Sequence, residues 1–214
     1  MAGPRGEYRK SAERRSQILE AAFAVFARSG YTSSSVSEIA RAVGMTQTGV
    51  LHHFSGGKIA LLRAVLERRD ARAEQLLAGR SGRDVLTGLL EISRTQVVQR
   101  GAVQLYTVLA AEATDPDHPA HDYFAKRFER IADAVTAALA EVDAAGGLRE
   151  GVDPRRATMH LLALTEGLQL LWLNGLDVDL VGDVHRYLNT LLRTPLELPD
   201  PPPAPAAPTP PGAP

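Results

Sequence analysis

Residues 35–54 read SVSEIARAVGMTQTGVLHHF, and this stretch decides the fold. Its apolar residues recur at helical spacing on both sides of Gly44, which predicts two short helices joined by a tight turn. Ser35 and Glu38 form the pattern of a capping box, in which the serine accepts an amide proton and the glutamate reaches back to the cap amide. Thr46 is placed to cap the second helix, and Gly44 can adopt the left-handed conformation of a sharp turn. The segment therefore predicts a helix-turn-helix.

Side chains of these two helices divide into an inner and an outer face. The expected inner residues are Ile39, Ala40, Val43, Val50 and Leu51, with Met45 filling the turn, and the expected outer residues are Thr46, Gln47, Thr48, Gly49 and His52. A glutamine can pair with adenine through both groups of its amide, and a threonine offers a hydroxyl and a methyl group. Glycine lets the backbone approach a partner closely. This outer set favours a helix that reads base edges in the major groove of double-stranded DNA.

Helical periodicity continues through the rest of the chain, and no segment shows convincing strand alternation, so we expect an all-α fold. The expected helices cover residues 12–29, 35–43, 46–53, 57–77, 84–99, 104–113, 119–145, 154–174 and 182–192. The expected domains are a flexible basic leader (1–11), a three-helix DNA-binding domain (12–56), a helical effector-binding and dimerisation domain (57–194) and a disordered tail (195–214). Nine of the last 16 residues are proline, which favours an extended tail.

The charge is distributed unevenly although the whole chain has a net charge of only -1. The first 70 residues contain 11 Lys/Arg and 6 Asp/Glu, whereas the remainder is acidic. A basic N-terminal part on an acidic remainder indicates that only the first part meets a polyanion. The chain has no cysteine, no apolar N-terminal stretch and no segment apolar enough to span a membrane, so we expect a cytoplasmic protein.

Around the helix-turn-helix, the chain resembles the TetR family of bacterial transcriptional regulators. The resemblance covers residues 14–62 and is carried by Gly30-Tyr31, residues 36–40 (VSEIA), residues 43–46 (VGMT), and His53-Phe54 followed by Lys58. It implies an all-helical protein with a three-helix DNA-binding domain, a variable ligand-binding domain and dimerisation through the last two long helices. It also implies that operator DNA and a small-molecule effector are the partners, and it favours repression.

The resemblance also assigns roles by position. Ser34 and Ser35 are implied to contact phosphate at the start of the motif, and Lys58 to hold phosphate near the start of the fourth helix. The complete expected DNA-binding set is Ser34, Ser35, Thr46, Gln47, Thr48, Gly49, His52 and Lys58. The chain departs from the family pattern at Leu51, where the family usually has a tyrosine that contacts the DNA backbone. The linker at residues 55–57 is also one residue longer than the commonest form.

Aromatic and isolated polar residues on three otherwise apolar predicted helices indicate a ligand site. The expected ligand-binding residues are Tyr106, Tyr123, Phe124, Phe128, Glu166, Gln169 and Trp172. Glu166 and Gln169 lie one turn apart in a leucine-rich helix, where burying them without partners would be costly. A small, largely apolar effector with a polar or cationic group would be such a partner. Core packing of the aromatic residues and a contact of Glu166 across a dimer remain open alternatives.

The helix over residues 154–174 has apolar side chains around its circumference, which favours a subunit interface formed with residues 182–192 and hence a homodimer. Arg14 and Arg15 belong either to an arm that contacts DNA or to a solvated leader. His118 and His121 stand one turn apart, but a third metal ligand is not specified, so no metal is expected. No cofactor is expected either.

We therefore expect a ligand-responsive DNA-binding regulator and not an enzyme. The alternative classes are a helical ligand-binding enzyme or an adaptor with a basic N-terminal part. The sequence lacks a glycine-rich phosphate loop, a zinc-protease motif and a serine nucleophile motif, which argues against the first alternative.

Overall fold

A computed structural model describes residues 4–198, together with their side chains except those of residues 4–8, 72 and 96. Within this range the chain forms nine helices and no strand, and the one isolated bridge pairs Leu148 with Leu192. The helices are α1 (Pro4–Ser29), α2 (Val36–Ala42), α3 (Gln47–His53), α4 (Gly57–Leu77), α5 (Gly82–Val98), α6 (Arg100–Glu112), α7 (His121–Ala144), α8 (Pro154–Leu173) and α9 (Leu180–Leu191). The all-α prediction is confirmed.

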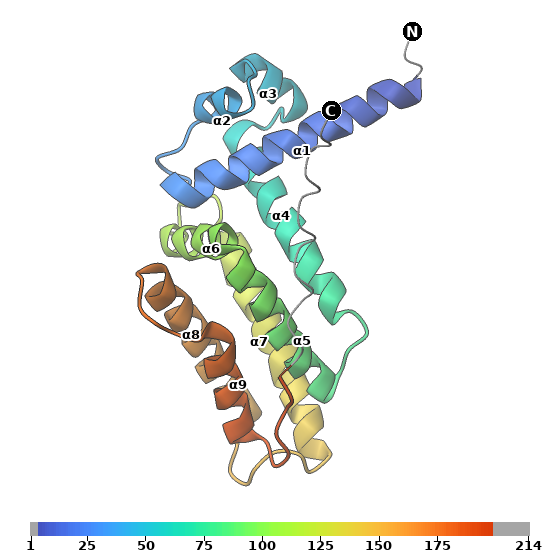
Figure 1. Ribbon diagram of the computed structural model, residues 1–214, viewed down its shortest axis with the longest axis vertical. Helices are drawn as coiled ribbons and strands as arrows, with labels where there is room; N and C mark the ends of the chain where they lie inside the picture. The colour runs from blue at the N-terminus through green and yellow to red at the C-terminus, as the bar shows by residue number, and fades with distance from the viewer. Residues whose placement is uncertain (1–3, 199–214) are drawn as a thin grey trace, which may run out of the picture.

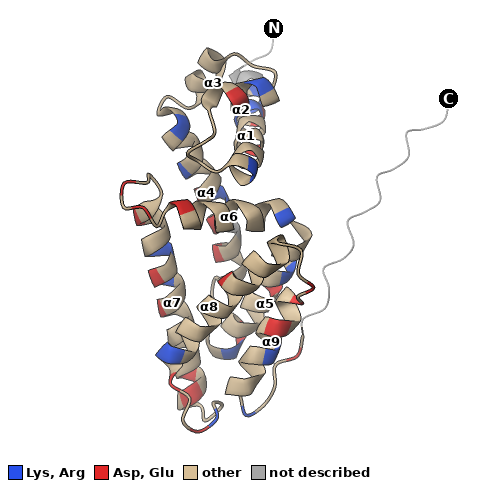
Figure 2. Ribbon diagram, turned by 90° about the vertical axis from the view of Figure 1, so that its left-hand side faces the viewer, with Lys and Arg blue, Asp and Glu red and all other residues tan. Residues whose placement is uncertain are grey.

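The molecule has a head and a body joined by one long helix (Figure 1). The head consists of α1, α2 and α3, and the body consists of α5 to α9. Helix α4 begins beside α3 and descends along the body (Figure 1). Helix α6 lies crosswise at the top of the body, directly beneath the head (Figure 2). This placement makes α4 and α6 the two elements through which body and head meet.

Two hydrophobic cores follow this arrangement. The first core joins the head to α4, to α6 and to the start of α7, and its fully buried side chains include Ile18, Phe26, Ile39, Leu61, Leu66, Leu105 and Leu109. The second core joins α5, α7, α8 and α9, with Leu86, Leu90, Leu139, Leu188 and Leu192 fully buried. The predicted domain boundary after residue 56 therefore differs from the packing, because the first half of α4 belongs to the core of the head.

The N-terminal end of α1 differs from the sequence-based expectation. The helix begins at Pro4, so residues 4–11, which we predicted as part of a flexible leader, are helical. Proline is well tolerated in the first turn of a helix, where its missing N–H has no intrahelical partner to lose. Arg9 and Glu13 also form an ion pair of 3.5 Å at i,i+4 spacing, which supports the extended helix.

The chain beyond α9 also differs from the sequence-based expectation of a disordered tail from residue 195, because its first residues are anchored. Leu196 is only 6% exposed, and its N–H donates to Oδ1 of Asn189 at 2.7 Å. The carbonyl oxygen of Leu196 lies 2.8 Å from Nε2 of His185. The predicted tail therefore begins after this contact, and its remainder, residues 199–214, lies outside the described residues. No helix within residues 4–198 is both long and apolar enough to cross a membrane.

Candidate DNA interface and ligand site

The two caps of the helix-turn-helix form as the sequence predicts. Oγ of Ser35 accepts the N–H of Glu38 at 3.1 Å, and Oγ1 of Thr46 accepts the N–H of Gly49 at 3.1 Å. Gly44 has a φ of 65°, the left-handed conformation expected at the turn. The second half of the predicted capping box is wrong, because the Glu38 carboxylate pairs with Arg28 at 2.5 Å instead of reaching back to the cap amide. A guanidinium on α1 is the stronger partner for this carboxylate.

Helix α3 presents one face to the core and the other to solvent. Val50 is fully buried and Phe54, its C-cap residue, is 3% exposed, so these two side chains anchor the helix. Leu51, predicted as an anchor, is only half-buried. The exposed residues of α3 and its cap are Thr46, Gln47, Thr48 and His52. This division leaves a polar outer face on a firmly packed helix.

Gly49 and Gln47 have surroundings that the sequence pattern did not reveal. A Cβ atom at Gly49 would lie 3.2 Å from Cε of Met45 and 3.3 Å from Oγ1 of Thr46, so a side chain here would press on the turn and the cap. Oγ of Ser37 donates to Oε1 of Gln47 at 2.7 Å. This bond from α2 orients the glutamine amide before any partner arrives.

The side chains of Ser34 and Lys58 both donate hydrogen bonds to carbonyl oxygens of the loop between α1 and α2. Ser34 is 6% exposed, and its hydroxyl donates to the carbonyl oxygen of Tyr31 at 2.8 Å, so this hydroxyl is not presented for a phosphate contact. Nζ of Lys58 donates to the carbonyl oxygen of Thr32 at 3.3 Å and lies 4.3 Å from the centre of the Tyr31 ring. Burial lowers the pKa of Lys58, and the charge of Glu112 opposes this effect.

Arg15 packs against the end of α3, whereas the sequence left open whether it belongs to a DNA-contacting arm or to a solvated leader. Its guanidinium donates to the carbonyl oxygen of His53 at 2.6 Å and lies 4.0 Å from the centre of the Phe54 ring. A cation at the C-terminal end of a helix satisfies unpaired carbonyl groups and interacts favourably with the helix dipole. Arg15 therefore fixes the end of α3 against α1, whereas Arg14 bonds to Gln17 on its own helix.

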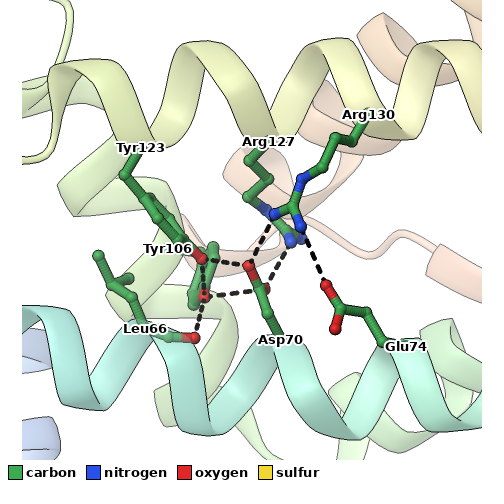
Figure 3. Close-up of polar contacts among 7 residues, drawn as sticks. All are labelled: Leu66, Asp70, Glu74, Tyr106, Tyr123, Arg127 and Arg130. Carbon is green, nitrogen blue, oxygen red and sulfur yellow. Dashed lines mark hydrogen bonds and ion pairs between the residues drawn. The ribbon is translucent and has the colours of Figure 1, made fainter.

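A buried carboxylate organises the upper body (Figure 3). Asp70 on α4 is 7% exposed and accepts hydrogen bonds from the hydroxyls of Tyr106 at 3.2 Å and Tyr123 at 2.5 Å. Arg127 on α7 contacts the same carboxylate at 2.6 Å, and Arg130 lies 3.6 Å from it. We call Asp70, Tyr106, Tyr123, Arg127 and Arg130 the Asp70 cluster. It ties α4 to α6 and α7, and sequence reasoning missed its central carboxylate and both arginines.

Four of the seven predicted ligand residues meet at this cluster. The rings of Tyr106 and Tyr123 lie 5.7 Å and 5.2 Å from that of Phe124, which lies 6.2 Å from Phe128. The two tyrosine hydroxyls are 2.9 Å apart. Burial raises the pKa of both tyrosines, which keeps them as neutral hydrogen-bond donors. Four of the five predicted aromatic residues therefore converge in space.

Glu166 on α8 lies close enough to two arginines near this cluster for their charges to act on it. Its side chain is exposed by surface area, yet enough protein surrounds the carboxyl group that desolvation raises its pKa. The positive charges of Arg127 and Arg69 oppose that rise. The guanidinium of Arg69 lies 3.4 Å from the centre of the Tyr106 ring, which places this second arginine at the same location.

Trp172 is the predicted aromatic ligand residue for which the structure gives a different setting. Trp172 packs against the second core, and the guanidinium of Arg100 lies 4.7 Å from the centre of its ring. Arg100 also donates to the carbonyl oxygen of Leu173 at 2.8 Å, so this pair ties the start of α6 to the end of α8. Gln169 is buried in α8. Helical spacing alone could not separate Trp172 from the aromatic residues of the first core.

Comparison with known proteins finds relatives of this chain. The sequence model described as "Bacterial regulatory proteins, tetR family" matches residues 18–65, which contain the whole helix-turn-helix. The HTH-type transcriptional regulator TtgR of Pseudomonas putida is 26% identical over 189 residues, covering 83% of this chain and 89% of TtgR. The probable HTH-type transcriptional regulator ArpR of Pseudomonas putida is 27% identical over 189 residues, with the same coverage of both chains.

Solved structures extend the likeness to the body. NalD, the secondary repressor of the MexAB-OprM multidrug efflux pump in Pseudomonas aeruginosa, is similar with a TM-score of 0.66 and 26% identity, covering 86% of this chain and 98% of NalD. SmeT, the repressor of the Stenotrophomonas maltophilia multidrug efflux pump SmeDEF, has a TM-score of 0.67 at 23% identity and covers 88% of this chain and 97% of SmeT. The second likeness bears on the fold alone. The helical layout of head and body is thus shared over most of each chain.

Proposed function

The chain belongs to the TetR family of bacterial regulatory proteins, and from this premise we propose that it is a homodimeric repressor whose binding to operator DNA is weakened by a small-molecule effector. It is a regulator of transcription and not an enzyme. The observation that carries the proposal is the outer face of α3, where exposed polar side chains stand on a helix anchored by buried Val50 and Phe54. Such a face can enter a major groove without disturbing the core.

The proposed DNA contacts divide into base-reading and phosphate-binding groups. We assign base reading to Thr46, Gln47, Thr48, Gly49 and His52, and phosphate contact to Ser35 and Lys58. Ser34 is left out because its hydroxyl is buried. Lys58 uses one of its three N–H donors on the Thr32 carbonyl, which leaves two for a charge-assisted bond to a phosphate oxygen.

The proposed subunit interface lies on α8. Met159, Leu170 and Leu171 on this helix, and Leu176 just after it, are large apolar residues with 39% to 51% of their surface exposed. Burying such a patch against its own copy would remove apolar surface from water and relate two heads by a two-fold axis. A dimer is also required for specificity, because one short helix reads too few base pairs. Sedimentation of the wild type as a monomer at micromolar concentration would contradict this interface.

The proposed effector site is the Asp70 cluster together with Phe124, Phe128 and Glu166. Both carboxylate oxygens of Asp70 are already engaged by the two tyrosines and Arg127, so an effector binds by displacing some of these contacts. Aromatic walls with a few placed polar groups are typical of sites for small, largely apolar molecules. Glu166 would receive a polar or cationic group of that molecule. The repressor NalD, which is 26% identical, supports repression as the direction of control.

The test of DNA recognition begins with a duplex selected from a random-sequence library by the wild-type protein. Gln47→Ala should weaken binding to the selected duplex by about 1 to 3 kcal/mol and leave binding to random DNA nearly unchanged. Lys58→Ala should weaken binding to both duplexes and reduce the salt dependence. Lys126→Ala, which removes an exposed cation from α7 in the body, is the matched control and should change neither.

Three outcomes would contradict the proposal. If Gln47→Ala changed the affinity for both duplexes equally, α3 would not read bases. If Lys126→Ala weakened binding as much as Lys58→Ala, the contact would be a general charge effect. If single-stranded RNA of equal length bound more tightly than any duplex, the protein would be an RNA-binding adaptor.

A further inference from the structure

A carboxylate of the body holds the loop that follows α1 in the head. Oε2 of Glu112, the last residue of α6, accepts the N–H of Tyr31 at 2.7 Å, and its Oε1 accepts the N–H of Thr32 at 3.3 Å. Gly30 makes room for this contact, because a Cβ atom there would lie 2.5 Å from Oε1. The N–H groups of the loop that follows α1 need hydrogen-bond acceptors. Here the carboxylate of a residue 81 positions from Tyr31 is the acceptor.

The same carboxylate lies among the other groups that fix this loop. Lys58, at the start of α4, covers the Tyr31 ring and donates to the carbonyl oxygen of Thr32. His118, in the loop after α6, packs edge-on against Tyr31 at 5.2 Å, and its Nε2 lies 3.7 Å from Oε2 of Glu112. The loop leads within three residues to Ser35, the N-cap of α2. A shift of Glu112 therefore acts on the entry to the helix-turn-helix and on a proposed phosphate contact together.

Helix α6 connects this contact to the Asp70 cluster. Tyr106 and Glu112 lie on the same helix fewer than two turns apart, and the Tyr106 hydroxyl contacts Asp70 and Tyr123. Leu105 and Leu109, between and beside them, are fully buried against the core of the head. A packed helix moves as a unit, so a displacement at Tyr106 reaches Glu112.

We propose that Glu112 is the positioning residue through which the body and the DNA-binding head sense each other's state. In this proposal the carboxylate contacts neither DNA nor effector. It holds the Gly30–Thr32 loop and lies near Lys58, and a movement of α6 in the body displaces it. This inference rests on the proposed function, because it assigns a residue to the coupling that such a regulator requires. The two sites affect one another reciprocally, so DNA bound at the head must also change the body through the same contact.

This reciprocity allows a test that needs no effector. The probe is the duplex selected by the wild-type protein, and the readout is amide hydrogen exchange over α6 and the start of α7, with and without that duplex. The variants are Glu112→Ala and Glu112→Gln. Glu91→Gln is the matched control, because Glu91 is a partly exposed carboxylate that is ion-paired with Arg80 inside the body.

In the free protein, Glu112→Ala should raise the exchange rates of the Tyr31 and Thr32 amides about tenfold or more, the effect of losing hydrogen bonds to a charged acceptor. Wild type and Glu91→Gln should show slower exchange in α6 when the duplex is bound. Glu112→Ala should bind the duplex with an affinity within about tenfold of wild type but lose most of that change in α6. If the alanine variant does not fold, the same criteria apply to Glu112→Gln, whose neutral amide keeps the size but offers only one acceptor oxygen.

Three results would overturn the coupling alone, and the first two are an unchanged response of α6 in the Glu112 variants and no response of α6 in wild type that binds the duplex. A wild-type protein that binds no duplex would instead overturn the proposed function, and the coupling with it. A loss of response in Glu91→Gln equal to that in Glu112→Ala would show a general effect of removing a carboxylate and would also refute the inference.

Discussion

Replacement of Asp70 by asparagine should lower the free energy of unfolding by about 3 kcal/mol, the low end of the cost of leaving a buried charge without its partner. The carboxylate is 7% exposed, and the Arg127 side chain that it neutralises at 2.6 Å is 17% exposed. Asparagine keeps the shape and one acceptor oxygen, so Tyr106 and Tyr123 retain part of their bonding. The guanidinium of Arg127 loses its ionic partner and remains largely shielded from water.

Thermal unfolding at fixed protein concentration measures this effect, because subunit association would otherwise shift the midpoint. For a chain of this size, each kcal/mol corresponds to about 2 to 4 °C, so the melting temperature should fall by about 6 to 12 °C. Glu74→Gln is the matched control on the same helix, one turn further on. Glu74 contacts Arg130 at 3.0 Å but is 63% exposed, so its removal should cost less than about 1 kcal/mol.

The double variant Asp70→Asn/Arg127→Met isolates the interaction between the two charges. Removing both charges should recover a large part of the stability lost in Asp70→Asn, since no unpaired charge is left buried. The reasoning is refuted if Asp70→Asn and Glu74→Gln lower the melting temperature equally. It is also refuted if the effects of Asp70→Asn and Arg127→Met simply add.

Three further predictions, the first with a control variant, test other features. Gly30→Ala should lower the free energy of urea unfolding by about 2 kcal/mol, because position 30 has a φ of 72° and a Cβ atom there clashes with Glu112. Gly44→Ala is the control: its φ is 65° but its surroundings are open, so it should lower the free energy by about 1 kcal/mol. Leu196→Ala should cost about 2 kcal/mol in the same assay if the segment after α9 is anchored. Glu166→Gln should match wild type in melting temperature at about pH 4 and exceed it at about pH 7. The reason is that a raised carboxyl pKa in the folded state makes wild type lose stability as pH rises through that range.

Local patterns predicted the features that depend on neighbouring residues. The caps at Ser35 and Thr46, the left-handed Gly44 and the bounds of the helix over residues 57–77 follow from side chains within one or two turns. The same local pattern could not distinguish Ser34 from Ser35, since both are serines at the start of the motif. Their surroundings differ only in the folded chain, where Ser34 bonds back to Tyr31 and is buried while Ser35 is exposed.

Contacts between distant segments are where sequence reasoning failed. Asp70 and Arg127 are 57 residues apart, and no periodicity on either helix points to the other. Glu38 had a local partner available in the cap amide, but Arg28 on the preceding helix offered a charged one. Aromatic composition indicated that the body holds a polar and aromatic cluster, but only the tertiary structure identifies the carboxylate at its centre.

The two faces of α3 have a consequence for how such a protein can change over generations. Val50 and Phe54 carry the packing, whereas Gln47 and Thr48 project into solvent and contribute little to stability. Most exposed positions tolerate substitution within about 0.5 kcal/mol. On the proposed function, mutations at these two positions would alter the preferred DNA sequence at little cost in stability. Paralogues that arise by gene duplication could in this way acquire new target genes in few steps, and an engineer could retarget the protein by randomising the same positions.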